Sequence, residues 1–188
     1  MSTAKQVLSL LWIIALAGCV PSLHELYTPE TLVFDPSLIG CWETSGGDQW
    51  YFIRHAENDA YHLVITEKEN KRSALLAHLT DLDGQRYLDL YPDGDAQLCT
   101  GDWYKFHLLG VHTFLRVEQT DPNLVLTVIQ PDAVEELLDK KPTLIKHEVV
   151  NDRVVLTGSP YQLQAFLKNP EVQRQIFSDP THLTPCRP

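Results

Sequence analysis

The chain has 188 residues, with 15 basic and 25 acidic side chains and a formal net charge of −10. This length suffices for one globular domain and scarcely for two. A net negative surface argues against nucleic-acid binding and against electrostatic adhesion to anionic lipid, since both partners are themselves negative.

Residues 1–18 have the pattern of a secretory signal peptide. Lys5 precedes an apolar run from Val7 to Ala17. The run is too short to span a bilayer, because a spanning helix needs ~20 apolar residues. An ordinary signal peptide that happens to hold a cysteine, or an uncleaved anchor, is the alternative to a signal that ends in a modified cysteine.

The apolar run ends in Leu16-Ala17-Gly18-Cys19, and these four residues resemble the lipobox of bacterial lipoproteins. The resemblance implies that Cys19 carries a diacylglyceryl group, whose acyl chains are palmitate or similar. It also implies that the chain is cleaved just before Cys19. The partner would then be a membrane, since each buried methylene contributes ~0.8 kcal/mol. The residue after Cys19 is Val20 and not an aspartate. This resembles the pattern of Gram-negative lipoproteins that are exported to the outer membrane and face the periplasm.

Residues 19–37 contain three prolines and no regular period, which indicates a lipidated tether. At its end, Asp35 is a good N-cap and Pro36 a good first residue for one helical turn. From residue 38 the pattern changes, and the expected single domain covers residues 38–178.

Alternation of apolar and polar residues predicts consecutive short antiparallel strands. Asp83-Gly84 is a strong hairpin signal between two of them. The expected strands cover 38–43, 49–54, 61–67, 74–82, 85–91, 103–119 (as one strand or two), 124–130, 145–150 and 153–157.

Helices are expected only late in the chain. Residues 131–140 begin with a proline, carry acids in the first turn and end before Pro142. Ser159 and Gln162 have the spacing of a capping box for a helix over 159–168, and a second helical segment extends to Phe177. Residues 179–188 are interpreted as a proline-broken tail.

These elements predict a mainly β fold, an antiparallel meander of eight or nine strands that closes, or nearly closes, as a barrel. Gly40-Cys41-Trp42 on the first strand resembles the Gly-x-Trp signature of lipocalins and related barrels. The resemblance implies that Trp42 plugs the closed end, that Gly40 is its hinge and that Arg153 stacks over the tryptophan. It also implies that helix 159–168 packs on the barrel wall, whereas the helix at 131–140 departs from the lipocalin pattern.

The chain has four cysteines, and acylation of Cys19 would leave three for one disulfide. We predict a bridge between Cys99, in a long loop, and Cys186, in a tail that needs anchoring. Lipocalins often bridge a C-terminal cysteine to the middle of the barrel, which supports this pairing by analogy. The pairs Cys41–Cys99 and Cys41–Cys186 stay open as rivals.

The sequence offers no arrangement typical of catalysis or metal binding. His107 and His112 are five residues apart and fall on opposite faces of a regular strand, and Ser159 lacks the setting of a hydrolase nucleophile. The acidic run from Asp81 to Asp95 does not fit a calcium loop. We therefore expect neither an enzyme nor a metal or cofactor site.

An aromatic cluster surrounds the long loop after residue 91. Its members either line the mouth of a cavity or simply cover apolar surface; they are Tyr87, Tyr91, Trp103 and Tyr104. The barrel hypothesis favours a lipid-anchored envelope lipoprotein that binds a small apolar ligand or lipid. The alternative is an envelope lipoprotein without a cavity that docks a protein partner.

Overall fold

The structure, a computed structural model, describes residues 19–55, 59–68, 71–94 and 108–187. Its elements are β1 (Leu32–Val33), η1 (Pro36–Leu38), β2 (Gly40–Thr44), β3 (Gln49–Arg54), β4 (Ala60–Thr66), β5 (Arg72–Leu82), β6 (Gln85–Pro92), β7 (Thr113–Gln119), β8 (Leu124–Val128), α2 (Pro131–Lys140), β9 (His147–Val150), β10 (Arg153–Leu156), α3 (Pro160–Lys168), α4 (Pro170–Gln175) and β11 (Thr181–Pro185).

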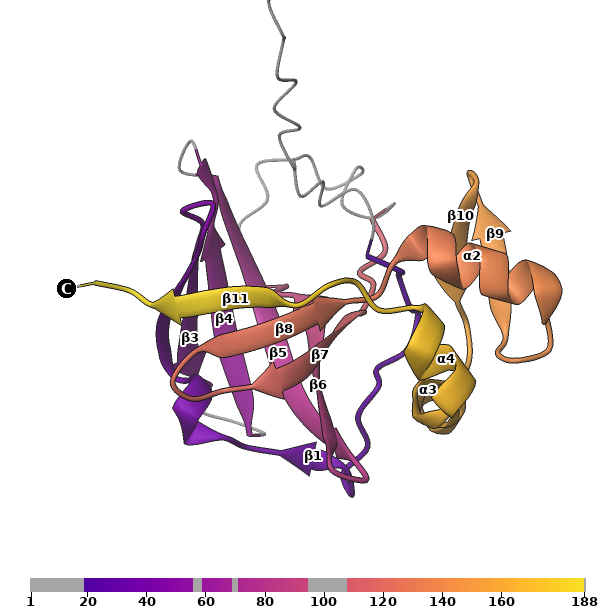
Figure 1. Ribbon diagram of the computed structural model, residues 1–188, viewed down its shortest axis with the longest axis horizontal. Coiled ribbons are helices and arrows are strands. Elements are labelled where there is room, and N and C mark those ends of the chain that lie inside the picture. The colour runs from indigo at the N-terminus through magenta and orange to yellow at the C-terminus, as the bar shows by residue number, and fades with distance from the viewer. Residues whose placement is uncertain (1–18, 56–58, 69–70, 95–107, 188) are drawn as a thin grey trace, which may run out of the picture.

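Within the described residues, eight strands form a closed antiparallel barrel. Strands β2 to β8 follow one another as a meander, and β11 returns to lie between β8 and β2 (Figure 1). The two-residue strand β1 pairs with β5 just beyond the end of β4. The structure confirms the predicted mainly β fold, the closed barrel and the three late helices.

Alternation along the strands directs one set of side chains into the barrel, where they form a continuous core. Cross-strand neighbours such as Phe52 and Leu63 meet inside it, and Trp42 is only 6% exposed. The buried members are Leu38, Trp42, Phe52, Tyr61, Leu63, Ala77, Leu79, Leu88, Leu90, Leu115, Val117, Leu124, Leu126 and Leu183. We call this set the interior core.

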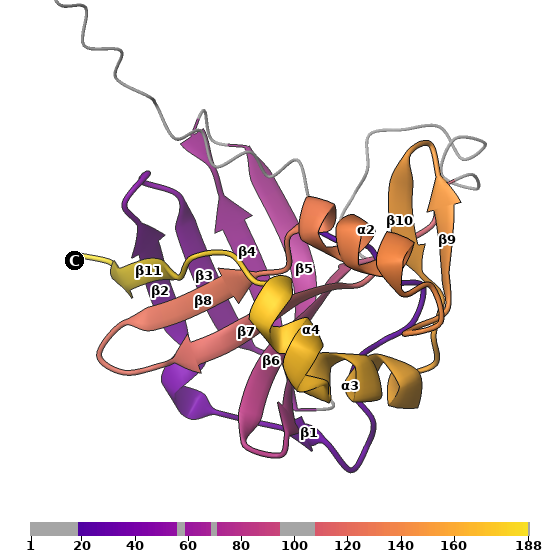
Figure 2. The same cartoon turned by 45° about the vertical axis from the view of Figure 1, so that its right-hand side comes forward.

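Helices α2, α3 and α4 lie to one side of the barrel strands (Figure 2). A second core lies between these helices and the outside of the barrel. Tyr87, Phe114 and Ile129 point outward from the barrel side and meet apolar side chains of α2, α3 and α4. The helical members recur at intervals of three and four residues, as one face of a helix requires. They are Val134, Leu137, Leu138, Leu163, Phe166, Leu167 and Val172, and we call the whole set the outer core.

Both ends of the chain differ from the sequence-based expectation. The predicted tail contains β11, whose Leu183 is fully buried between β2 and β8. The predicted tether packs on the barrel wall, with Val20, Leu26 and Thr28 buried. The hairpin β9–β10 is a separate two-stranded sheet rather than part of the barrel.

The predicted Cys99–Cys186 bridge is wrong, because Cys186 bonds to Cys41, one of the rival pairings. The Cα atoms of this pair are 5.3 Å apart, and the Cys186 N–H donates to the Cys41 carbonyl at 2.9 Å. Since Pro185 pairs with Trp42 across β11 and β2, the next residue on β11 falls opposite Cys41. Cys99 lies outside the described residues.

The closed end of the barrel is formed where the chain enters β2. Asp35 accepts from the Ser37 N–H at 2.9 Å and Pro36 starts the helical turn, as predicted. Trp42 Nε1 donates to the Leu38 carbonyl at 2.9 Å, which ties the indole to this turn. Gly40 has φ +136° with no atom within 4 Å of an added Cβ, so its backbone conformation, not space, favours glycine here.

The arginine at this end is Arg86 and not Arg153. Arg86 Nη1 lies 2.6 Å from Asp35 Oδ2, whereas Arg153 lies exposed on the separate β9–β10 hairpin. The predicted stacking of Arg153 over Trp42 is therefore wrong. Alternation correctly predicted a strand at Arg153, but it could not show that this strand belongs to a separate sheet and not to the barrel.

Candidate functional site

The start of the described chain is held between two other segments. Ser22 forms an antiparallel bridge with His112 on one side and a parallel bridge with Leu156, the last residue of β10, on the other. The Ser22 N–H donates to the His112 carbonyl at 2.9 Å, and the Leu156 N–H donates to the Pro21 carbonyl at 2.8 Å. Residues just after the candidate lipidation site are thus part of the folded body.

The buried carboxylate of Asp89, on the outer face of β6, holds the same N-terminal segment against the barrel. Asp89 is fully buried on the outer face of β6, where Oδ2 accepts from the Leu26 N–H at 2.7 Å and Oδ1 lies 2.7 Å from His112 Nδ1. Gln164 of α3 donates to the Leu26 carbonyl at 2.9 Å. Because a buried carboxylate needs such partners, Asp89 serves to seat residues 22–26 on the barrel.

Cys19 is the one free cysteine of the described residues and is half-buried. Burial raises the pKa of its thiol, which makes the thiol a poor nucleophile in the folded protein. Val20, the next residue, is buried in the outer core. A group attached to Cys19 would therefore emerge at the surface of the domain without a flexible spacer.

The barrel end opposite η1 has an apolar rim. Trp50 and Ile65 pair directly across β3 and β4, and Leu75 lies on the next strand. Together with Val128 they pack against the interior core but stay partly exposed. We call these four residues the barrel mouth. Below them the interior is filled by fully buried side chains such as Phe52 and Tyr61.

The predicted mouth residues lie elsewhere. Tyr87 points outward and is fully buried in the outer core, and burial raises its pKa to about 12. Tyr91 also points outward, with its ring 4.5 Å from that of His112. The interpretation as a cavity mouth is therefore wrong for both tyrosines, and for Tyr87 the alternative, that the residue covers apolar surface, is confirmed. Trp103 and Tyr104 lie outside the described residues.

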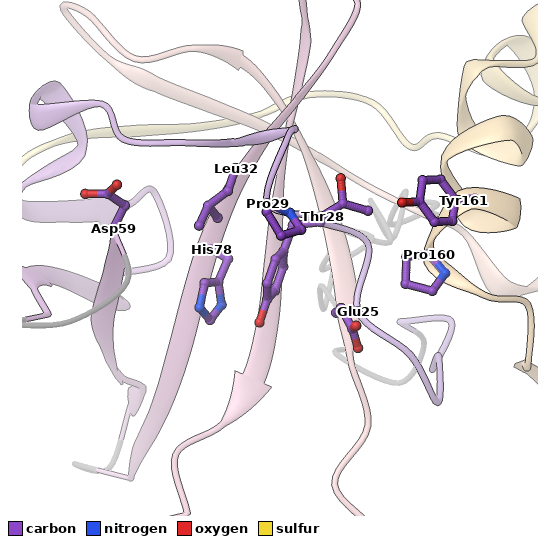
Figure 3. A pocket seen from close by; sticks show the side chains of 9 residues that line it. Glu25, Thr28, Pro29, Leu32, Asp59, His78, Pro160 and Tyr161 are labelled. Atoms are coloured by element: carbon purple, nitrogen blue, oxygen red, sulfur yellow. The ribbon is translucent and has the colours of Figure 1, made fainter.

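A hollow of about 530 Å³ lies on the outer wall of the barrel (Figure 3). Its lining comes from the N-terminal segment, β5, Asp59 before β4, and the start of α3. Tyr27 stacks on His78 with ring centroids 4.2 Å apart, and the carboxylates of Glu25 and Asp59 border it. The lining is mostly apolar and aromatic, with the polar groups of Glu25, Asp59 and His78 at its border.

Two groups of this hollow titrate abnormally. Burial lowers the pKa of His78, the Asp89 carboxylate opposes this shift, and His112 and His55 add to it. Burial also raises the pKa of Tyr27, with further contributions from Asp89 and Glu25. His78 thus favours its neutral form at the wall of the hollow.

In the part of the chain that the structure describes, no group of three His, Cys, Asp or Glu side chains could hold a metal ion. None of the described helices is both long and apolar enough to cross a membrane.

Sequence reasoning missed the Asp89–His112 pair and the true mouth. A signal for the pair existed, because residues 85–91 place Tyr87, Asp89 and Tyr91 on one face and leucines on the other. A strand with aromatic residues beside one acid on its outer face indicates a covered wall whose acid needs a partner. Nothing in the sequence separated Trp50 and Ile65 from other inward residues.

We compared the chain with protein-family models, curated proteins and solved structures, and no match was found in any of the three searches.

Proposed function

We propose that this protein is a lipid-anchored lipoprotein of the bacterial cell envelope, carried by the outer membrane and facing the periplasm. The support is the lipobox-like Leu16-Ala17-Gly18-Cys19 and the position of Cys19. Among the described residues, the contacts that seat the N-terminal segment begin with Val20, next to the proposed cleavage site.

We further propose that the barrel binds a small apolar molecule or a lipid chain at its mouth. The observation that carries this proposal is the set of partly exposed inward side chains on β3, β4, β5 and β8, namely Trp50, Ile65, Leu75 and Val128. Apolar side chains around a concave opening with few polar groups are typical of sites for apolar ligands. The filled interior below them favours a shallow site that takes one end of the ligand.

The anchor is tested by metabolic labelling with a palmitate analogue. Wild-type protein should be labelled and found with membranes. The Cys19→Ser variant should lose the label and become soluble or accumulate as precursor. Equal labelling of both proteins would exclude acylation of Cys19.

The ligand site is tested by titrating a fluorescent fatty acid into the unacylated Cys19→Ser protein. Replacement of Ile65 by Glu should weaken binding at least tenfold, since it places a charge in the apolar mouth. The matched control is Ile53→Glu, because Ile53 lies on the neighbouring strand but is 55% exposed on the outer wall. Equal binding by both variants would place the ligand elsewhere.

The filled interior also supports a second candidate, an envelope lipoprotein that docks a protein partner and holds no ligand. It predicts no saturable fatty-acid binding by the Cys19→Ser protein. Native mass spectrometry of that protein would then show the bare polypeptide mass, whereas the ligand-binding candidate predicts a co-purified apolar molecule.

A further inference from the structure

Exposed apolar side chains occur near the three segments that meet at Ser22: on the N-terminal segment, just before His112, and on β9, the partner strand of β10. Leu23 lies on the N-terminal segment, Leu108 and Leu109 precede His112, and Val149 and Val150 end β9. Leu109 is 74% exposed and Val149 is 64% exposed. We call these five residues the N-terminal apolar edge.

The pairing at Ser22 directs Cys19 toward the hairpin part of this edge. Strand β10 runs from the turn at Asn151-Asp152 to Leu156, and Ser22 pairs with Leu156 in parallel. Followed back from Ser22, the chain therefore runs toward the side of that turn, where β9 ends in Val149 and Val150. Figures 1 and 2 share their vertical axis and show the β9–β10 turn pointing the same way as the ends of β4 and β5 at the barrel mouth.

The reach of the chain sets how far the domain can stand from the membrane. Two residues, Val20 and Pro21, separate Cys19 from the hydrogen-bonded Ser22, and the three Cα-to-Cα steps span at most ~11 Å in extended conformation. Acyl chains on Cys19 must enter the bilayer within that distance. The body of the protein therefore touches the bilayer surface instead of floating above it on a tether.

We propose that the N-terminal apolar edge lies in the headgroup region of the membrane and turns the barrel mouth toward the bilayer. This inference rests on the proposed acylation of Cys19. It gives a role to side chains such as Leu109 and Val149 that otherwise face water. Apolar contact is the expected driving force, since the acidic chain is not attracted to anionic lipid.

Charge on the hairpin does not oppose this contact. The acidic Glu148 and Asp152 are balanced by Lys146 and Arg153, and all four are exposed. The hairpin part of the edge is therefore an apolar surface with a locally neutral border, which suits zwitterionic headgroups. With the mouth facing the membrane, an apolar ligand would have a short path between the bilayer and Trp50.

The test is hydroxyl-radical footprinting of the mature acylated protein in phosphatidylethanolamine and phosphatidylcholine vesicles, compared with the Cys19→Ser protein in solution. Oxidation of Leu109, Val149 and Val150 should fall at least fivefold on vesicles. Ile53 and Tyr161, which are 55% and 70% exposed on other surfaces, serve as internal controls and should not change. Equal oxidation of the edge in both samples would overturn the proposed orientation.

A variant separates anchoring from orientation. Val149→Asp/Val150→Asp should stay on vesicles through its acyl chains but lose the protection of Leu109, whereas Ile53→Asp should keep it. Persistent protection of Leu109 in the double variant would contradict a role for the hairpin. If the N-terminal peptide carries no acyl mass and the protein does not float with vesicles, the proposed acylation fails, and the inference fails with it.

Discussion

The interior core of the barrel is built mostly from consecutive hairpins, whereas the outer core joins the two ends of the chain. Inside the barrel, each strand from β2 to β8 pairs with the next. In the outer core, Val20 and Leu26 meet side chains of α3 and α4, more than 130 residues later; one such link, from Gln164 to Leu26, spans 138 residues.

This difference separates the local from the non-local parts of the fold. Hairpins close short loops, so their pairing costs little chain entropy and follows the alternation of the sequence. The outer core forms only when both termini return to the same wall. We therefore expect changes to the two cores to affect different sets of elements.

The largest effect is expected for the disulfide bond that ties the C-terminal end of the chain to β2, which we call the seam of the barrel. The Cys41–Cys186 bond closes a separation of 145 residues, for which the chain-entropy description gives up to about 5 kcal/mol. Cys186→Ser should lower the free energy of unfolding by a large part of this amount, measured by urea denaturation without reductant.

The control for the seam is the double variant Cys41→Ser/Cys186→Ser. Because one bond is lost in either case, the double variant should be little less stable than Cys186→Ser alone. Peptide mapping without reductant should recover residues 41 and 186 in one cross-linked fragment. A fragment joining Cys99 to Cys186 would contradict the seam.

The next largest effect is expected for the interior core. Trp42 is buried and its Nε1 donates to the Leu38 carbonyl, so Trp42→Ala leaves a large cavity and an unpaired carbonyl. Unfolding should become easier by ~3–5 kcal/mol, with hydrogen exchange rising in all barrel strands together.

The counterpart in the outer core is Leu163, which is fully buried on α3. Leu163→Ala should cost ~2–4 kcal/mol and should raise hydrogen exchange in α2, α3 and α4 more than in β2 to β5. A uniform rise across the whole molecule in this variant would show that the two cores unfold as one unit.

Much of the barrel could be predicted, because alternation identifies strands and Asp83-Gly84 identifies a hairpin. Residue 83 has φ 56° and residue 84 has φ 90°, as a tight turn between β5 and β6 requires. Strand β11 could not be predicted, since THLTP is short and contains a proline. It forms because β2 and β8 present two open edges that need a partner.

The predictions for sites were less successful, for a related reason. Tyr87 and Tyr91 were placed near a loop that follows them in the sequence, but the outward face of β6 is covered by residues from both ends of the chain. Likewise, the arginine at the closed end comes from β6 rather than β10, because Arg86 lies within reach of Asp35. Neither the cover of β6 nor the Arg86–Asp35 pair follows from the positions of these residues along the chain.

A smaller effect is expected where the N-terminal segment joins the outer wall. Asp89→Asn keeps an oxygen for the Leu26 N–H but removes the charge that faces His112. The loss should be ~1.5–3 kcal/mol, the range for hydrogen bonds to charged groups. Limited proteolysis should reveal faster cleavage within residues 19–31. The exposed Asp152→Asn is the control, and equal cleavage in both variants would contradict this role for Asp89.

The smallest effect is expected at the closed end of the barrel, where it depends on pH. Partial burial alone would raise the pKa of Asp35, but hydrogen bonds from Ser37 and Arg86 and the Arg86 charge outweigh it and hold the pKa below its ordinary value. A carboxylate whose pKa is lowered in the folded state adds stability above its unfolded pKa. That stability is lost as the pH falls through the folded pKa.

Arg86→Met should therefore reduce the free energy of unfolding by about 1 kcal/mol at pH 7, since the ion pair is only partly buried. The difference between wild type and variant should shrink as the pH falls below ~4, where Asp35 becomes protonated in the unfolded chain. The midpoints of urea unfolding of both proteins at pH 7 and at pH 3 measure this difference in stability. Lys140→Met, at the exposed Lys140–Glu136 pair, is the control and should show little effect at pH 7. A difference for Arg86→Met that stays constant with pH would mean that the side chain acts through packing alone.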